Sequence, residues 1–383
     1  RRAASFLVRN GPVTQQDRWE EDAGYSPFTL AVVIAALLVA AEMADACSEP
    51  DVAAYLRDTA DVWNDYVERW TYVSGTPLAH QTGVEGYYVR IAPPEVCTVA
   101  SPNQGFVPIK NRPPGEMETP TEQIVSPDAL ALVRFGLRAA DDPRIVNTVK
   151  VIDVLLKVDT PRGPAWHRYN GDGYGEHENG APFDGTGRGH AWPLLTGERA
   201  HYELAAGRAD DARKLMRAMV AFANDGGMLP EQIWDAPDII RKELLLGRPS
   251  GSAMPLVWAH AEYVKLLRSL REERVFDMPP QTFERYATRK PPCAHGFWRF
   301  NHKTRSFGAG RILRIEVLAQ AIVHWSDDGW HTMHDSETQD TGLGVHKVDL
   351  PTVTLAPGTV VTFTFFWHQA ARWEGANFEI LVG

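Results

Sequence analysis

Two loop segments carry carboxylic acids that could work as an acid–base pair. Trp19, Glu20 and Glu21 stand just before the most apolar stretch of the chain, and Glu231 lies some 210 residues later in a Gly- and Pro-containing segment. One protonated and one ionised carboxyl group facing a common pocket is the arrangement that cleaves a glycosidic bond. Each segment also has a plainer interpretation. Carboxylates near a helix N-terminus complement its dipole, and Glu231 could be solvated in a turn.

A third segment, residues 167–176, offers hydrogen-bonding groups among glycines. Arg168, Tyr169, Asp172 and Tyr174 supply donors and acceptors on a backbone that can approach a ligand closely. Arg168 would give sugar hydroxyls a fixed charge. The alternative is a turn-rich surface loop. Flat faces on which sugar rings could stack would come from three tryptophans, namely Trp19, Trp192 and Trp234.

Composition limits the classes of protein to consider. The chain has 383 residues, 44% of them hydrophobic and 23% charged, which is typical of a globular protein. Its net charge of -10 argues against nucleic acid and fits a neutral partner. Three widely spaced cysteines, Cys47, Cys97 and Cys293, specify neither a metal site nor a disulfide framework. We expect no cofactor and no metal ion.

The longest apolar run, Phe28 to Ala41, is too short to cross a bilayer and predicts a buried helix rather than membrane insertion. Residues 51–70 instead predict an amphipathic helix with one wet face. This alternation suggests two concentric layers, with the apolar helices inside. Long loops separate further predicted helices, and loops of such length are usually functional. These helices are expected at 127–139, 143–158, 192–206, 209–223 and 252–271.

The character of the sequence changes near Pro291. Short β-rich segments bounded by Gly, Pro and Asp predict a small antiparallel β-sandwich at residues 293–383. Residues 1–276 would form the helical domain and 277–292 a linker. The predicted strands are 311–318, 345–355, 360–367 and 378–382. Tryptophans of this region could form its core or a glucan-binding surface, and the sequence leaves both open.

Four ordered motifs resemble those of glycoside hydrolase family 15, the glucoamylases. Asp17-Arg18-Trp19-Glu20-Glu21, with Gly24 and Ser26-Pro27-Phe28-Thr29, resembles the general-acid signature. Leu229-Pro230-Glu231-Gln232, with Trp234-Asp235, is similar to the general-base signature. Arg168-Tyr169, with Asp172 and Tyr174, resembles the substrate-binding segment, and residues 189–199 are similar to the bacterial branch.

The resemblance implies a role for each matching residue. Glu20 would be the general acid and Glu231 the general base that activates water. Arg168 would hold the sugar in the innermost subsite. The remaining expected substrate-binding residues are Trp19, Glu21, Tyr169, Asp172, Tyr174, Trp192 and Trp234.

The resemblance also implies a fold and an activity. The family fold is an (α/α)6 toroid of twelve helices, and about eight are predicted here. Because Arg1 to Phe6 reads as the middle of a helix, we expect N-terminal helices to be missing. The implied activity is inverting, exo-acting release of glucose from non-reducing ends of α-glucans, with glucodextranase or trehalase as alternatives.

Other classes remain open at this point. They are an inactive fragment, a carbohydrate-binding protein, and a phosphorylase in which phosphate replaces activated water. The expected partner is an α-glucan or oligosaccharide. The chain is further expected to be a monomer outside the cytoplasm.

Overall fold

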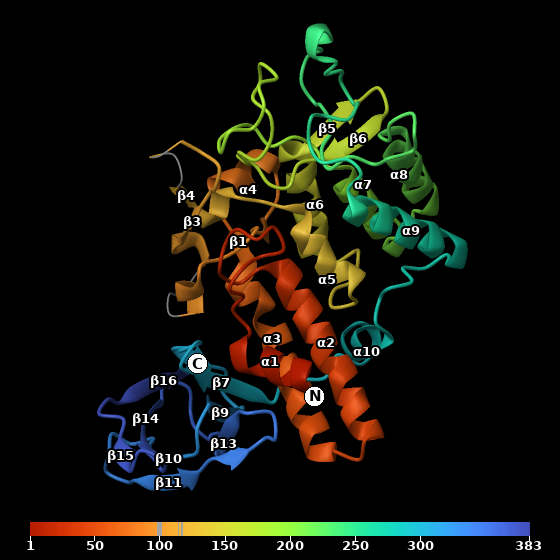
Figure 1. The fold of residues 1–383 in the computed structure, drawn as a ribbon. Helices are drawn as coiled ribbons and strands as arrows, with labels where there is room; N and C mark the ends of the chain where they lie inside the picture. The colour runs from red at the N-terminus through yellow and green to blue at the C-terminus, as the bar shows by residue number, and fades with distance from the viewer. Residues whose placement is uncertain (98–101, 114, 116–117) are drawn as a thin grey trace.

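Helices form one part of the molecule and a β-sandwich the other (Figure 1). The computed structural model describes residues 1–97, 102–113, 115 and 118–383. In Figure 1 the sandwich lies beside α1 and α3, while α6–α9 lie at the opposite end. The helices are α1 (Arg2–Asn10), α2 (Pro27–Ala46), α3 (Pro50–Thr71), α4 (Pro77–Thr82), α5 (Ala131–Arg134), α6 (Pro143–Leu155), α7 (Pro193–Ala205), α8 (Ala209–Ala221), α9 (Val257–Glu272) and α10 (Pro280–Thr282).

The start of α2 follows from its cap. Ser26 adopts an extended conformation and its side chain accepts a hydrogen bond from the backbone N–H of Thr29, while Pro27 occupies the first helical position. Both features are standard N-terminal signals. This cap sets the point where the loop carrying Glu20 ends and the helix begins.

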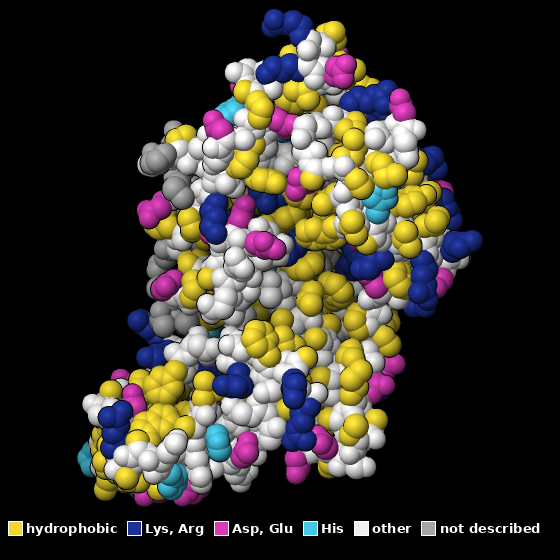
Figure 2. Space-filling model, in the orientation of Figure 1, with side chains coloured by type: hydrophobic (Ala, Val, Ile, Leu, Met, Phe, Trp, Pro, Cys, Tyr) yellow, Lys and Arg dark blue, Asp and Glu magenta, His cyan; other side chains and the backbone are white. Residues whose placement is uncertain are grey.

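The predicted burial of α2 is incomplete. Val32 and Met43 are exposed, and Figure 2 shows hydrophobic side chains gathered on this face between α2 and α9. By length and composition alone α2 could span a membrane, but half of its most apolar window is buried within the protein, as in a core helix. The helix packs mainly on α3 and also contacts α1, α5 and α10, while Val32 and Met43 stay exposed.

Small hairpins occupy the segments that the sequence predicts as long loops. The paired strands are β1 (Tyr72–Ser74) with β2 (Gly86–Tyr88), β3 (Phe106–Pro108) with β4 (Glu118–Pro120), and β5 (Lys157–Thr160) with β6 (Gly163–Trp166). The helix predicted at 252–271 begins only at Val257. Residues before it instead pair with the segment of Glu231: Leu256 N–H donates to Leu229 O, and Glu231 N–H to Ala253 O.

The C-terminal region is a two-sheet sandwich with its own core. One sheet has the order β11-β10-β14-β16-β8, with β15 on β14, and the other has the order β12-β13-β9-β7. The predicted strands correspond to β9, β13, β14 and β16. The bounds are β7 (His295–Arg299), β8 (Ser306–Phe307), β9 (Ile312–Val317), β10 (Ala321–Ser326), β11 (His334–Glu337), β12 (Gln339–Asp340), β13 (His346–Leu350), β14 (Val360–Trp367), β15 (Arg372–Trp373) and β16 (Phe378–Val382).

The sandwich is not wholly antiparallel, which corrects the prediction. β7 pairs with β9, and β16 with β8, in parallel. In each of these pairs the partner strands are joined by more than a tight turn, which is what parallel pairing requires.

The predicted linker is folded rather than extended. After α10, residues Phe283–Arg289 form a π-helical turn. Asp61 of α3 binds Arg285 and accepts a hydrogen bond from the hydroxyl of Tyr286, while Arg134 pairs with Asp277 at 2.8 Å. These polar contacts fix the segment against the helices.

The sandwich supports the loop that carries Glu20. Arg299 of β7 donates hydrogen bonds of 2.7 Å to the carbonyl oxygens of Val8 and Gly11. His302 of the sandwich hydrogen-bonds the hydroxyl of Tyr25. The two ends of the loop therefore rest on the C-terminal region.

Candidate active site

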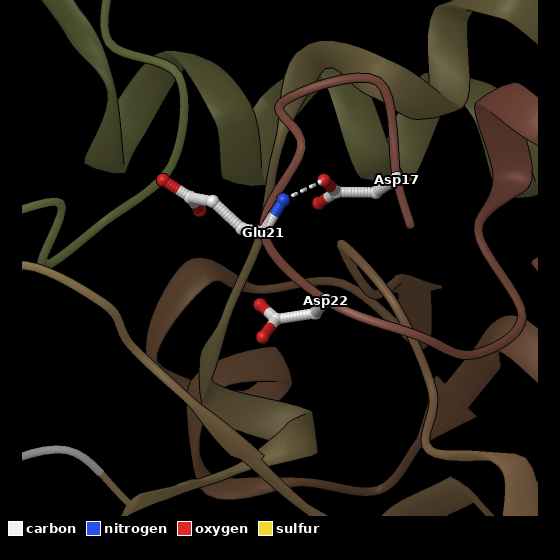
Figure 3. Close-up of side chains that lie close together, drawn as sticks. All are labelled: Asp17, Glu21 and Asp22. Atoms are coloured by element: carbon white, nitrogen blue, oxygen red, sulfur yellow. Dashed lines mark hydrogen bonds between the residues drawn. The ribbon is translucent and has the colours of Figure 1, made fainter. Parts of the chain in front are cut away.

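Arg90 holds together three carboxylates of the loop before α2. Figure 3 shows Asp17, Glu21 and Asp22, whose oxygens lie within 4.8 Å of one another. The fully buried guanidinium of Arg90 reaches them at 2.6, 2.7 and 2.9 Å respectively. A buried charge is tolerated when it is paired and hydrogen-bonded. The carboxylates thus serve as partners of an arginine, and they lock the loop.

Glu21 joins this loop to the glycine-rich third segment. Besides Arg90, its carboxylate accepts hydrogen bonds from Arg168 at 3.0 Å and from the hydroxyl of Tyr169 at 2.6 Å. Burial raises the pKa of Glu21, although Arg168 and Arg90 oppose this rise. Its side chain is only 6% exposed, so it acts as a hub that positions Arg168.

Glu20, the neighbour of Glu21, stands in a strained turn and is exposed. Its φ of 61° lies in the left-handed region, which costs a non-glycine residue about 1–3 kcal/mol. Two hydrogen bonds of 3.1 Å hold the turn: the backbone N–H of Glu20 donates to Asp17 O, and the side-chain amide of Gln16 donates to Glu20 O. Two adjacent carboxylates are thereby separated: Glu21 is buried and Glu20 is exposed.

Arg168 lies among aromatic rings from three of the four motifs. Its guanidinium carbon is 5.1 Å from the ring centre of Trp19, 5.0 Å from Tyr174 and 5.5 Å from Trp192. Trp19 and Trp192 meet edge to face at 5.3 Å. Cation–π attraction is strongest when the groups are desolvated, as they are here.

Asp172 fixes the plane of Arg168. It accepts bonds of 2.7 and 2.8 Å from Nε and Nη2 of the guanidinium, a bidentate geometry that sets orientation as well as charge. The same carboxylate accepts the backbone N–H of Tyr174 at 2.9 Å. The backbone carbonyl of Asp172 accepts the N–H of Gly189 at 2.8 Å, which ties this segment to the one that precedes Trp192.

Glu231 lies half-buried beside a cavity of about 440 Å³. Burial raises its pKa, while a backbone N–H of Ala253, the charge of Arg168 and the hydroxyl of Tyr174 all favour its ionised form. The cavity is also lined by Tyr174, Glu176, Phe183, Gln232, Lys242 and Ser252.

The residues that follow Glu231 are tied to the segment before Trp192. The side chain of Gln232 accepts His190 N–H at 3.0 Å and donates to Tyr174 O at 2.9 Å. Asp235 pairs with His190 at 2.7 Å and His167 at 2.9 Å. Burial would raise the pKa of Asp235, but these two histidines lower it below its usual range.

The structure brings together most of the residues singled out in the sequence. Arg168 contacts the loop of Glu20 through Glu21 and Trp19, and it faces Glu231 through Tyr174. The arrangement places half-buried Glu231 beside a fixed cation and aromatic rings, and the loop that carries exposed Glu20 contacts the same cation through Glu21 and Trp19. Such a set can transfer protons to and from a neutral sugar held by hydrogen bonds.

Trp234 does not offer the stacking face that the sequence suggests. Its ring is fully buried, lies 4.9 Å from His190, and donates its N–H to Pro237 O at 2.9 Å. It is a core residue of its own loop. Sequence reasoning also missed Arg90, a single arginine in an irregular region with no periodic signal, together with Glu176, Phe183 and Lys242 of the cavity.

Comparisons with known proteins agree with these motifs. Residues 1–268 match the family model described as glycosyl hydrolases family 15. A glucoamylase of Clostridium sp. (strain G0005) is 42% identical over 287 residues, which cover 75% of this chain and 38% of that protein. The crystal structure of a bacterial glucoamylase complexed with acarbose is 43% identical with a TM-score of 0.66, over 74% of this chain and 39% of that one. The chain therefore spans well under half the length of these relatives.

Proposed function

Since the chain belongs to glycosyl hydrolase family 15, we propose that it carries the acid–base pair of an inverting, exo-acting α-glucoside hydrolase that releases glucose from α-glucans. The names of its relatives, a glucoamylase of Clostridium and a bacterial glucoamylase of known structure, support this choice. The observation that carries it is Arg168, which touches Trp19 and Glu21 on one side and Tyr174 on the other, where Tyr174 hydrogen-bonds Glu231.

In the proposed reaction, Glu20 gives its proton to the glycosidic oxygen as the bond breaks. Ionised Glu231 takes a proton from a water molecule that attacks the opposite face of the sugar ring. Inversion needs the two carboxyl groups about 6.5–9.5 Å apart, so that this water fits between them and the substrate. The strained turn at Glu20 serves this reaction, because Glu20 stays exposed while its neighbour Glu21 pairs with Arg90.

Arg168 would bind hydroxyls of the innermost sugar. Asp172 and Glu21 engage its Nε and Nη2, so its remaining donors are presented in a set orientation. Trp19, Trp192 and Tyr174 surround it and would contact the sugar faces. Preorganised donors of this kind need little rearrangement during the reaction.

We further propose that the helices of residues 1–276 form part of an (α/α)6 toroid. The open apolar faces of α2 and α9, which expose Val32, Met43, Val257 and Val264, support this, because helices from outside this chain would cover them. The protein would act as a monomer, without membrane insertion. A polymeric substrate favours a place outside the cytoplasm.

The substrate order that we propose is α-1,4 glucans, then α-1,6 glucans, then trehalose. Glucose release from maltotriose, dextran and trehalose by this chain and by a version extended at its N-terminus would test it. Glu20→Gln and Glu231→Gln should each abolish turnover while sugar binding persists. Glu178→Gln, which alters an exposed carboxylate, is the matched control and should retain activity. Full activity in either site variant would refute the assignment, and phosphate-dependent release would indicate a phosphorylase.

A further inference from the structure

The outer face of one sheet of the sandwich carries aromatic rings where polar side chains are usual. In a sandwich the outward positions of a strand normally face water. Here Phe366 of β14 pairs with Trp373 of β15 on one side and with Ile322 of β10 on the other. Phe365, the preceding residue, is fully buried in the core, so Phe366 is on the outer face. Figure 1 shows these strands at the end of the molecule that lies away from α6–α9.

A strained turn adds a further ring to this face. Trp330, between β10 and β11, has a φ of 69°, which is uncommon for a bulky residue and is maintained only where the surroundings enforce it. Ser326 Oγ accepts the N–H of Trp330 at 2.9 Å, and Asp328 accepts the N–H of Thr332 at 2.8 Å. The turn is thus braced by side chains.

The rings lie against one another in a continuous set. His324 stacks on Trp330 with centres 5.3 Å apart and planes 16° apart, and it meets Trp373 edge to face at 5.6 Å. Trp373 also contacts Phe366 at 5.4 Å and is 52% exposed. We call His324, Trp330, Phe366 and Trp373 the aromatic platform.

Hydrogen-bonding groups border the aromatic platform. Asp335 binds His324 at 2.7 Å and is 68% exposed, and Glu337 binds His368 at 3.0 Å and is 58% exposed. Each of these contacts uses one carboxylate oxygen, so a second oxygen can accept from a hydroxyl group. Flat rings with hydroxyl acceptors at their edge match a sugar, whose C–H face is apolar and whose rim is polar.

The size of the platform favours a narrow ligand over a protein partner. From the areas typical of aromatic side chains, the platform exposes roughly 300 Å². A stable protein interface covers about 800 Å² on each partner. Apolar patches of a few hundred Å² on a monomer are often functional.

We propose that the aromatic platform is a non-catalytic binding site for an α-glucan chain. The site lies beyond the family match at residues 1–268, and the choice of an α-glucan among carbohydrates rests on the proposed function. It would hold a polymeric substrate on the protein while the acid–base site acts on a chain end.

The test measures binding to insoluble amylose in the full chain carrying Glu231→Gln, so that the polymer stays intact. Adding Trp330→Ala or Trp373→Ala should weaken binding roughly tenfold or more, equivalent to the loss of one good contact. Trp373→Phe should restore most of it, which separates stacking from misfolding. Phe106→Ala, an exposed ring on β3, is the control and should bind as the parent does.

Unchanged binding in both alanine variants would overturn the proposal, as would equal binding to cellulose. A change in oligomeric state with Trp373→Ala would assign the platform to self-association instead. Maltotriose hydrolysis by the chain that carries Trp373→Ala alone tests the proposed function independently of amylose binding. If the chain without any substitution does not hydrolyse maltotriose, the proposed function is refuted. The amylose-binding result would then still test whether the aromatic platform binds α-glucan.

Discussion

Replacement of Arg90 by methionine tests the reasoning about the loop that carries Glu20. The guanidinium is fully buried and pairs with Asp17, Glu21 and Asp22 at 2.6 to 2.9 Å. Removing one partner of a buried ion pair leaves uncompensated charge and costs about 3–5 kcal/mol. Three carboxylates share this arginine, so we expect a loss near the upper end, about 5 kcal/mol of unfolding free energy at pH 7.

The loss should depend on pH in a defined direction. Burial already raises the pKa of Glu21 and of Asp22 above their usual values, even with Arg90 in place. Without Arg90 both pKa values rise further, so these groups take up protons in the folded variant at a higher pH than in the unfolded chain. The difference in unfolding free energy between the wild type and Arg90→Met should therefore shrink as the pH falls from 7 toward 4.

Urea unfolding of the wild type, Arg90→Met and Arg90→Lys at several pH values measures this effect. Lysine keeps the charge but cannot span three carboxylates, so the unfolding free energy of Arg90→Lys should lie between those of the wild type and Arg90→Met. A loss below about 1 kcal/mol for methionine, or one that stays constant from pH 7 to 4, would refute the account, since a buried pair broken on one side costs more.

Three further predictions concern single side chains. Tyr174→Phe removes a hydrogen bond to ionised Glu231, so the pKa of Glu231 rises and the acid limb of the pH–rate profile should move to higher pH; a move to lower pH would contradict this. Trp234→Ala should lower the free energy of unfolding measured in urea by about 3–5 kcal/mol, because the indole ring is fully buried. A change in KM with no loss of stability would instead indicate that Trp234 contacts the sugar. Ser26→Ala should cost about 1 kcal/mol through the lost cap of α2, and unchanged urea unfolding would mean that Pro27 suffices.

Much of the helical part could be predicted from local signals. Ser26-Pro27 marks the start of α2, and the apolar spacing after Asp51 predicts α3. Motif residues could also be located, because a loop anchored by a helix start or by glycines keeps its chemistry within a short stretch of sequence. Arg168 and Asp172 are an example, since their bidentate contact spans four residues.

Features that depend on distant partners could not be predicted. Arg90 is meaningful only through carboxylates some 70 residues earlier in the chain. The burial of Trp234 depends on how its loop packs on His190. The parallel pairings of β7 with β9 and of β16 with β8 are non-local and leave no short-range turn signal.

The anomer of the first product tests the central claim most directly. The account assigns proton donation to Glu20 and water activation to Glu231, which must invert the anomeric centre. Proton NMR during the first minutes of maltotriose hydrolysis should show β-glucose before mutarotation, and Glu231→Gln should show no release. Formation of α-glucose, or release that persists in Glu231→Gln, would contradict the account.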